Sequence, residues 1–488
     1  MAKQGHKDRL TPIDASFLHQ EKNASHMHVG AVVIFEGPPV PHDEFVKGLE
    51  SRLSLVPRYR QKLAFPRFEM GRPIWIDDPN FNVEYHVRNT ALPAPGSEEQ
   101  LRQLAGRIFS QRLDRSKPLW ELWLVQGLSE GRFALISKTH HALVDGVSGV
   151  DISTVLFDLS PVPEDSDGAG DGWTPQPEPS QAELVTEGIK GLLRTPVELA
   201  GRALGAVQHP GHTLEQAREA AEGVAEVAWA GVNPAPDVPL NTPIGPHRRV
   251  WWVRSRLKDF KEIKDALGGT VNDVVLTIVS GALGRWLRSR GTRTEGLELH
   301  ALVPVSIRSE DEKDALGNRI AAMRAPLPVY AQDPVERLRI VRESMGGLKE
   351  SKQALGAEVI SGLERFAPPT LLAQASRLNF STRLFNLIVT NVPGPQFPLY
   401  IQGREMLEIV PIAFLPEDHA LAIAVMSYNG KMDFGLLGDY DAMPDIDTFG
   451  ELLEESLAEM LDTARAVAKP PTREAATKQE PASTQSEG

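Results

Sequence analysis

Two adjacent histidines stand out among the residues whose types and spacing could support catalysis. The segment from Thr139 to Gly146 reads THHALVDG, in which His140 and His141 are followed by Asp145. It ends a run that predicts a strand, and strand alternation places the two imidazole rings on opposite faces. A histidine at a strand end has an ordinary pKa of about 6.5, which suits a general base at neutral pH. We expect one ring to be the base, held by the turn at Asp145 and Gly146.

Other catalytic patterns lack the context that their chemistry requires. Gly127 to Gly131 matches the Gly-x-Ser-x-Gly elbow of serine hydrolases, but a predicted strand follows where the elbow needs a helix, so the pattern indicates a hairpin turn. The tripeptide from Asp433 to Gly435 matches a kinase motif without an accompanying phosphate loop. No His-x-x-x-His string occurs, and adjacent histidines on opposite faces cannot chelate one ion, so we expect no metal.

The composition excludes several classes of protein. With no cysteine among 488 residues, the chain can hold no disulfide, iron–sulfur cluster or cysteine nucleophile. Lys and Arg number 52 against 65 Asp and Glu, and the net charge of −13 disfavours nucleic acid as a partner. The first residues do not resemble a secretory signal, and no run reaches the ~20 apolar residues that span a bilayer. Any membrane contact is therefore expected to be peripheral.

Helix and strand patterns alternate in both halves of the chain and predict an α/β fold with mixed sheets. In the first half, helices are predicted at 43–56 and 98–113, and strands at 28–35, 121–125 and 132–140. In the second half, helices are predicted at 258–267 and 271–287, and strands at 250–254, 299–306, 319–329, 385–390 and 419–428. These patterns place both histidines at the end of a hairpin strand.

Shifts in composition divide the chain into four parts. Residues 1–160 carry the two histidines. Residues 161–246 start with an acidic stretch, include an amphipathic helix at 181–208 and end proline-rich, which indicates a linker and crossover. Residues 247–468 form the second half. Residues 469–488 lose apolar periodicity and are expected to be a disordered tail.

His-His-x-x-x-Asp-Gly is the signature of the CoA-dependent acyltransferase superfamily, which includes chloramphenicol acetyltransferase and peptide-synthetase condensation domains. Within it, the chain resembles the bacterial wax ester synthase/acyl-CoA:diacylglycerol acyltransferases. The resemblance covers about residues 10–465, and its motifs occur in the family's order. They are Pro12–Phe17, Met27–Gly30, Pro118–Trp120, His140–Gly146, Pro239–Arg249, Val271–Asp273, Pro304–Arg308, Gly317–Asn318 and Asn391–Pro395. Each motif is weak alone, and the ordered set is specific.

The resemblance implies a fold and a reaction. Two chloramphenicol-acetyltransferase-like subdomains, joined by the helical and proline-rich crossover, would enclose a tunnel with His141 midway along it. His141 would take the proton of a diacylglycerol or long-chain alcohol hydroxyl as that oxygen attacks the thioester of acyl-CoA. No acyl-enzyme and no bound cofactor would be needed, and His140 would have a supporting role.

The resemblance also implies roles for other residues. Asp145 is expected to pair with Arg308 and to brace the turn, and Gly146 belongs to the same turn. Hydrogen-bond donors for the oxyanion are expected near Asn391. The remaining supporting residues are Asn272, Asp273, Pro118, Leu119 and Trp120. For Asn272 and Asp273 the alternative is that they cap the apolar helix that begins there.

Two other functions stay open at this stage. One is another CoA- or carrier-dependent acyl transfer or condensation, although the sequence shows no attached carrier domain. The other is a non-catalytic lipid-binding protein of the same fold, against which the intact His141, Asp145 and Gly146 argue. Because the lipid substrates are insoluble in water, we expect a cytoplasmic protein bound peripherally to a membrane or a lipid droplet.

Overall fold

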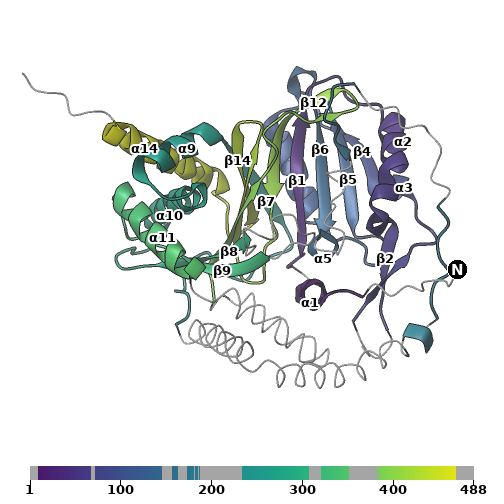
Figure 1. Cartoon of the computed structure of the whole chain (residues 1–488), viewed down its shortest axis with the longest axis horizontal. Helices are drawn as coiled ribbons and strands as arrows, with labels where there is room; N and C mark the ends of the chain where they lie inside the picture. The colour runs from purple at the N-terminus through teal and green to yellow at the C-terminus, as the bar shows by residue number, and fades with distance from the viewer. Residues whose placement is uncertain are drawn as a thin grey trace, which may run out of the picture.

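Two six-stranded sheets lie next to each other in the computed structural model, and helices cover the outer face of each sheet (Figure 1). This arrangement confirms the predicted α/β class with mixed sheets in two subdomains. The structure describes residues 9–22, 24–66, 72–144, 156–162, 173–180, 182–184, 186, 233–306, 320–350, 382 and 384–468. The predicted helix at 181–208 and the tail at 469–488 lie wholly or mostly outside these residues.

The N-terminal half builds most of the first sheet. Its elements are α1 (Pro12–Gln20), β1 (His28–Phe35), α2 (His42–Arg52), β2 (Gln61–Ala64), β3 (Ile74–Asp77), α3 (Val83–His86), β4 (Val87–Ala91), α4 (Glu98–Phe109), β5 (Trp120–Gln126), β6 (Phe133–His140) and α5 (His141–Val144). β5 and β6 are antiparallel, and the turn between them contains Gly127 and Gly131, both with positive φ. The predicted hairpin is therefore confirmed in place of a nucleophile elbow.

The C-terminal half supplies the second sheet and two further strands. Its elements are β7 (Arg248–Arg256), α9 (Leu257–Leu267), α10 (Val271–Ser289), β8 (Leu299–Ser306), β9 (Ile320–Leu327), α11 (Pro334–Glu350), β10 (Leu387–Pro393), β11 (Tyr400–Ile401), β12 (Arg404–Ile412), β13 (Leu421–Tyr428), β14 (Lys431–Asp439) and α14 (Ile446–Ala468). The second sheet has the order β7-β14-β13-β10-β8-β9, in which β10 is parallel to both of its neighbours. The other pairs in this sheet are antiparallel.

Two strands of the C-terminal half, β11 and β12, belong to the N-terminal sheet, whose order is β11-β12-β1-β6-β5-β4. β12 pairs antiparallel with β1, from Gly30 opposite Ile412 to Phe35 opposite Met406. The chain then returns to the second sheet as β13. Residues 400–412 of the C-terminal half are therefore exchanged into the first sheet.

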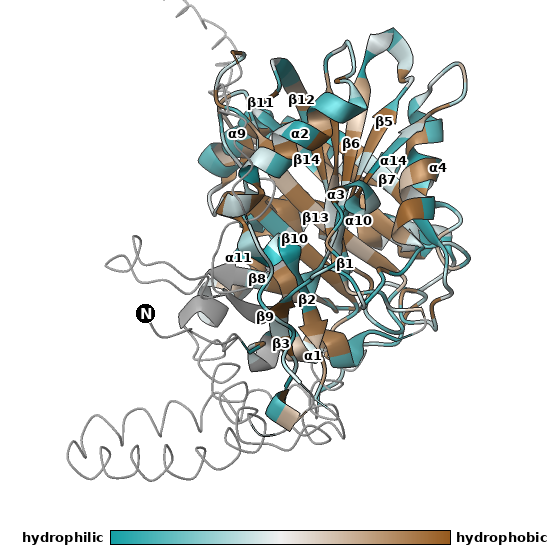
Figure 2. Ribbon diagram, turned by 90° about the vertical axis from the view of Figure 1, so that its right-hand side faces the viewer, coloured by the Kyte–Doolittle hydropathy of each residue, from teal (hydrophilic) through white to brown (hydrophobic). Residues whose placement is uncertain are grey.

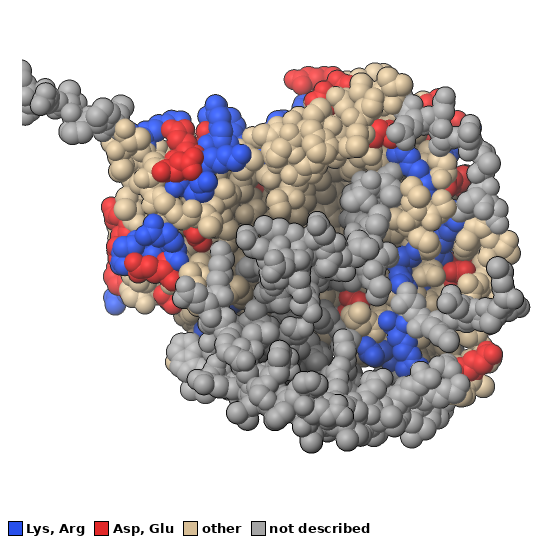
Figure 3. All heavy atoms as spheres, in the orientation of Figure 1, with Lys and Arg blue, Asp and Glu red and all other residues tan. Residues whose placement is uncertain are grey.

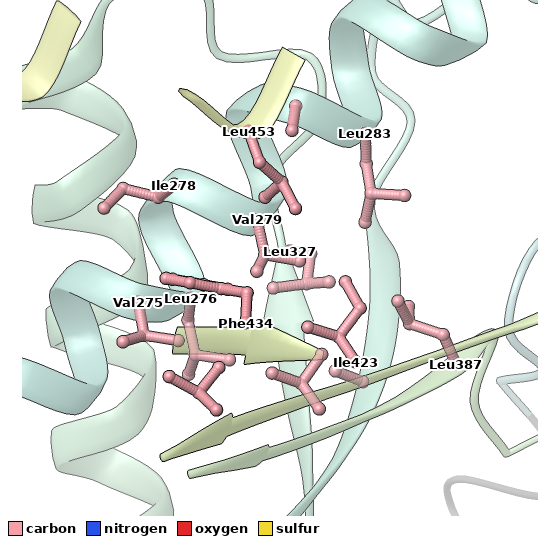
Figure 4. Close-up of a cluster of buried hydrophobic side chains, with 14 of the residues drawn as sticks. Val275, Leu276, Ile278, Val279, Leu283, Leu327, Leu387, Ile423, Phe434 and Leu453 are labelled. Carbon is pink, nitrogen blue, oxygen red and sulfur yellow. The ribbon is translucent and has the colours of Figure 1, made fainter. Parts of the chain in front are cut away.

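Alternate residues of the central strands face different core clusters. In β1, Val33 and Phe35 pack with residues of α2, whereas Val32 and Ile34 face a cluster that includes residues of the second sheet. α4 contributes to this second cluster and packs against β7. A third cluster lies between the second sheet and its outer helices, where α10 meets Phe434 of β14 (Figure 4). Apolar strands consequently fill the middle of the molecule (Figure 2).

The outer helices of the C-terminal half carry acidic and basic side chains close together (Figure 3). On α11, Arg339 pairs with Glu336 and Glu343 at 2.7 Å. On α14, Arg465 pairs with Glu262 of α9, also at 2.7 Å. Because the two signs neutralise each other locally, this face is not a basic surface of the kind that binds nucleic acid.

None of the described helices is by itself long and apolar enough to cross a bilayer. α9 and α10 pass the test of length and composition together, but the chain bends by 98° between them. α10 is a core helix, in which Trp286 and Leu287 are fully buried.

A buried carboxyl group lies near the place where β14, β7 and β12 meet. Asp433 on β14 is 1% exposed. Glu408 on β12 lies close to it and pairs with Arg254 at 2.8 Å and with Lys431 at 3.7 Å. Burial, together with the negative charge of Glu408, raises the pKa of Asp433 to about 7, against the opposing effects of Lys431 and Arg254.

This raised pKa predicts that Asp433 makes the protein less stable as the pH rises. Between the ordinary value of 3.8 and about 7, native Asp433 keeps a proton that the unfolded chain has released, so rising pH favours unfolding. Asp433→Asn removes this pH-dependent loss of stability. The melting temperature of the variant minus that of wild type should therefore be larger at pH 8 than at pH 4. Thermal unfolding followed by circular dichroism measures this difference. An equal difference at both pH values contradicts the prediction.

A close contact between β14 and β12 leads to a second prediction about stability. A β-carbon on Gly435 of β14 would lie 1.7 Å from the carbonyl oxygen of Pro411 in β12. Gly435→Ala must therefore push β12 away. We expect the free energy of unfolding, measured by chemical denaturation, to fall by about 1–3 kcal/mol or more. Gly346→Ala on α11 is the control, because nothing lies within 4 Å of that position and alanine favours a helix. Equal stabilities of the two variants would show that the contact imposes no constraint.

Candidate active site

His141 lies where the two halves of the chain meet, with an aromatic ring on each side of its own. It is the first residue of α5, directly after β6, and its backbone N–H donates to the carbonyl of Met27 at 2.8 Å. Phe17 of α1 stacks on the imidazole, with ring centroids 4.0 Å apart. Phe414, which follows β12, meets the same imidazole edge-on at 5.4 Å. The half-buried ring of His141 thus lies between α1 and the segment that follows β12.

His140 has different surroundings, as strand alternation predicts. It is 1% exposed, and its backbone N–H donates to the carbonyl of Leu119 at 3.0 Å. Its Nδ1 accepts the backbone N–H of Ala142 at 3.1 Å, so the proton of the neutral ring is on Nε2. Burial lowers the pKa of His140, although the nearby Glu21 opposes the shift. The ring is therefore neutral at pH 7.

Glu21 follows α1 and brings a buried negative charge to the histidines. One of its oxygens lies 3.7 Å from Nε2 of His140, which is longer than a full hydrogen bond. Its carboxylate accepts from Nε of Arg115 at 2.7 Å and from Nε of Arg112 at 3.3 Å. Burial alone would raise the pKa of Glu21, but the contact with His140 and the charge of Arg115 outweigh it and lower the pKa to about 2. The carboxylate is therefore ionised throughout the physiological range.

Sequence reasoning missed three residues of this site. Glu21 has no motif spacing of its own, and its position between two motif segments is the signal that could have drawn attention to it. Phe17 ends the first of those segments, but nothing in the sequence links it to His141. Phe414 comes from the other half of the chain, so its contact with His141 depends on the exchange of β12.

Leu119 and Trp120 hold the strand beside His140. Both are buried, and the indole Nε1–H of Trp120 donates to the carbonyl of Tyr59 at 2.8 Å. Nδ1 of His86 donates to the carbonyl of Trp120 at 2.8 Å, and the two rings stack with centroids 4.5 Å apart. Pro118 leads into this strand. The structure thus brings the predicted segment to His140 as part of the core.

Asp273 takes part in a helix cap, which was one of its two predicted roles. Thr270 is the N-cap of α10. The backbone N–H of Thr270 donates to the Asp273 carboxylate at 2.8 Å, and the backbone N–H of Asp273 donates to the Thr270 hydroxyl at 3.2 Å. Asn272 lies in the first turn of the same helix. Asn391 lies on β10 in the second sheet, opposite Val425 of β13. These residues belong to the second sheet and its helices, whereas His141 follows a strand of the first.

Three predicted site residues, Asp145, Gly146 and Arg308, lie outside the described residues. Within the part of the chain that the structure describes, no three His, Asp or Glu side chains are arranged to hold a metal ion.

A cavity of about 480 Å³ lies between the crossover and the end of β14, where Asp439 accepts the backbone N–H of Gly245 at 2.7 Å. Its lining includes neither histidine, so it is separate from the candidate site.

Two family models match most of the chain. Residues 10–275 match the wax ester synthase/diacylglycerol acyltransferase catalytic domain, and residues 316–461 match the WS/DGAT C-terminal domain. The Mycobacterium tuberculosis protein tgs1, described as a diacylglycerol O-acyltransferase, is 33% identical over 458 residues, which cover 93% of this chain and 96% of that protein. The protein tgs2 of the same species, described in the same way, is 34% identical over 460 residues and covers 93% of this chain and 98% of its own.

Solved structures have the same fold. The wax ester synthase/diacylglycerol acyltransferase from Marinobacter aquaeolei VT8 is 28% identical, with a TM-score of 0.63 over 94% of this chain and 100% of its own. The starter condensation domain of rhizomide synthetase RzmA is 14% identical, with a TM-score of 0.56 over 95% of each chain, and this shows the fold alone. The motifs, the fold and the matched length agree, and the chain belongs to the wax ester synthase/diacylglycerol acyltransferase family.

Proposed function

We propose that this acyltransferase moves a fatty acyl group from acyl-CoA to the hydroxyl of diacylglycerol or of a long-chain alcohol. The products are a triacylglycerol or a wax ester. The observation that carries the proposal is the position of His141 at the end of β6, between Phe17 and Phe414 from the two halves of the chain. The names of the M. tuberculosis relatives support diacylglycerol as an acceptor, and the name of the Marinobacter enzyme supports both acceptors.

His141 acts as the general base in this reaction. Its ring takes the proton of the acceptor hydroxyl while that oxygen forms a bond to the thioester carbon of acyl-CoA. The tetrahedral intermediate then breaks the carbon–sulfur bond, and the proton passes from His141 to the departing CoA thiolate. The acyl group goes directly from sulfur to oxygen, so the reaction requires no acyl-enzyme and no bound cofactor.

The oxyanion of the intermediate requires hydrogen-bond donors, and we place them near Asn391. Acyl-CoA and the lipid acceptor enter a tunnel from opposite sides and meet at His141. Because the lipid substrates are insoluble in water, the enzyme works in the cytoplasm on the surface of a membrane or a lipid droplet.

Replacement of His141 tests the mechanism. His141→Ala should lower the turnover number by ~10²–10⁴-fold, because the hydroxyl then loses its base. His140→Ala should have a smaller effect, because the His140 ring is buried on the other side. Release of free CoA thiol with hexadecanol and with diacylglycerol, measured side by side on variants with wild-type circular dichroism, gives both the rate and the acceptor preference. Wild-type turnover in His141→Ala rules out the general-base mechanism.

We further propose that Asp145 and Arg308 form a shielded ion pair that braces the turn after His141. Removal of one partner of a buried pair strands the other charge, so Asp145→Ala should cost ~3–5 kcal/mol of stability as well as activity. Asp145→Asn should be milder. In a double-mutant cycle, Asp145→Ala and Arg308→Ala should couple by more than ~1 kcal/mol in the free energy of unfolding. Simple addition of the two effects means that the pair does not exist.

A further inference from the structure

We propose that Glu21 is a positioning residue for His141, acting through His140 and through the last turn of α1. This inference rests on the proposed function, because it assumes that His141 is the base. Glu21 lies near the histidines but is closest to His140, with one oxygen 3.7 Å from Nε2. Its effect on the reaction is therefore indirect.

The first route runs through the backbone on both sides of His141. Three consecutive backbone N–H groups are held in place. The His140 N–H donates to Leu119, the His141 N–H donates to Met27, and the Ala142 N–H donates to Nδ1 of the His140 ring. The third bond exists only while Nδ1 has no proton. The ionised Glu21 favours the proton on Nε2, so it preserves the acceptor that fixes the start of α5.

The second route runs through the ring that stacks on His141. The Glu21 backbone N–H donates to the carbonyl of Phe17 at 3.1 Å, so the two residues share the last turn of α1. Arg115 binds the Glu21 carboxylate and also donates to the carbonyl of Leu18 at 2.9 Å. The ion pair therefore fixes the turn that carries Phe17, which lies 4.0 Å from the His141 ring. The Glu21 carboxylate therefore holds in place both the start of α5 and the Phe17 ring that stacks on His141.

A direct chemical role for Glu21 does not fit its surroundings. Its side chain is 1% exposed, and two arginines bind its oxygens. Such a carboxylate holds its charge too firmly to accept a proton from substrate. A purely structural role would lower stability and leave the turnover of the folded enzyme unchanged. Positioning predicts a loss of turnover in enzyme that is still folded.

The test compares Glu21→Gln with a matched control. Glu408→Gln also replaces a buried glutamate that pairs with two cations, Arg254 and Lys431, and it lies between the sheets away from the histidines. Turnover number and KM for acyl-CoA and hexadecanol are measured by thiol release on protein with wild-type circular dichroism. We expect Glu21→Gln to lower the turnover number by ~10–10²-fold with KM within about twofold, because a displacement on the order of 1 Å at the base has that effect. Glu408→Gln should retain wild-type turnover.

Two further variants identify the route and cover a failure to fold. Glu21→Asp keeps the negative charge beside the arginines but withdraws it from His140. This variant should fold, and its turnover number should be lower than that of wild type. In the double variant of Glu21→Gln with His140→Ala, the loss in turnover should be smaller than the product of the two single losses, because the two substitutions share the route through His140. Wild-type turnover in folded Glu21→Asp, or a multiplied loss in the double variant, overturns the proposal.

The same measurements separate this inference from the proposed function. If His141→Ala keeps wild-type turnover, the assignment of the base fails whatever Glu21 does. If His141→Ala is inactive and Glu21→Gln is as active as Glu408→Gln, the base stands and only the positioning role of Glu21 is wrong.

Discussion

The exchange of β12 between the two halves is the constraint on which the rest of the structure depends. β12 pairs with β1 in the first sheet, while β13 and β14, which follow it, lie in the second. The segment 413–420, which joins β12 to β13, therefore ties the two sheets together. Gly435 of β14 permits the close approach of β12, and Phe414, which follows β12, contacts His141. The geometry of the candidate base is therefore linked to the packing of the whole chain.

Buried charges form a second layer of organisation around the histidines. Glu21 is held by Arg112 and Arg115. On β6, the strand that ends at His140, Lys138 is fully buried. Its Nζ lies 3.3 Å from Glu121 and donates to the carbonyl of Ile108, at the end of α4, at 3.1 Å. Charges desolvated in this way are stable only with their partners in place. They fix the relative positions of α1, α4 and β6 more strictly than apolar packing alone.

Adjacent histidines can have different roles because a strand end gives them different surroundings. His140 is buried and neutral, and its ring accepts a backbone hydrogen bond from Ala142. His141 is half-buried between Phe17 and Phe414. One ring accepts a hydrogen bond that fixes the backbone, and the other lies between two aromatic rings, where we propose that it meets the substrate. This division supports a single base and direct transfer of the acyl group, the reaction that we propose.

The sequence by itself determined the fold class, the family, the pair of histidines and the elements with strong periodicity, such as α10 and the hairpin of β5 and β6. Local apolar patterns and turn glycines specify those features without distant contacts. The tertiary structure decided what no local pattern records. β12 carries charges at Arg404, Glu405 and Glu408, and β14 contains two glycines, so neither was predicted as a strand. Glu21 and Phe414 reach the histidines only because helix packing and strand exchange bring distant segments together, and a contact of that kind leaves no spacing in the sequence.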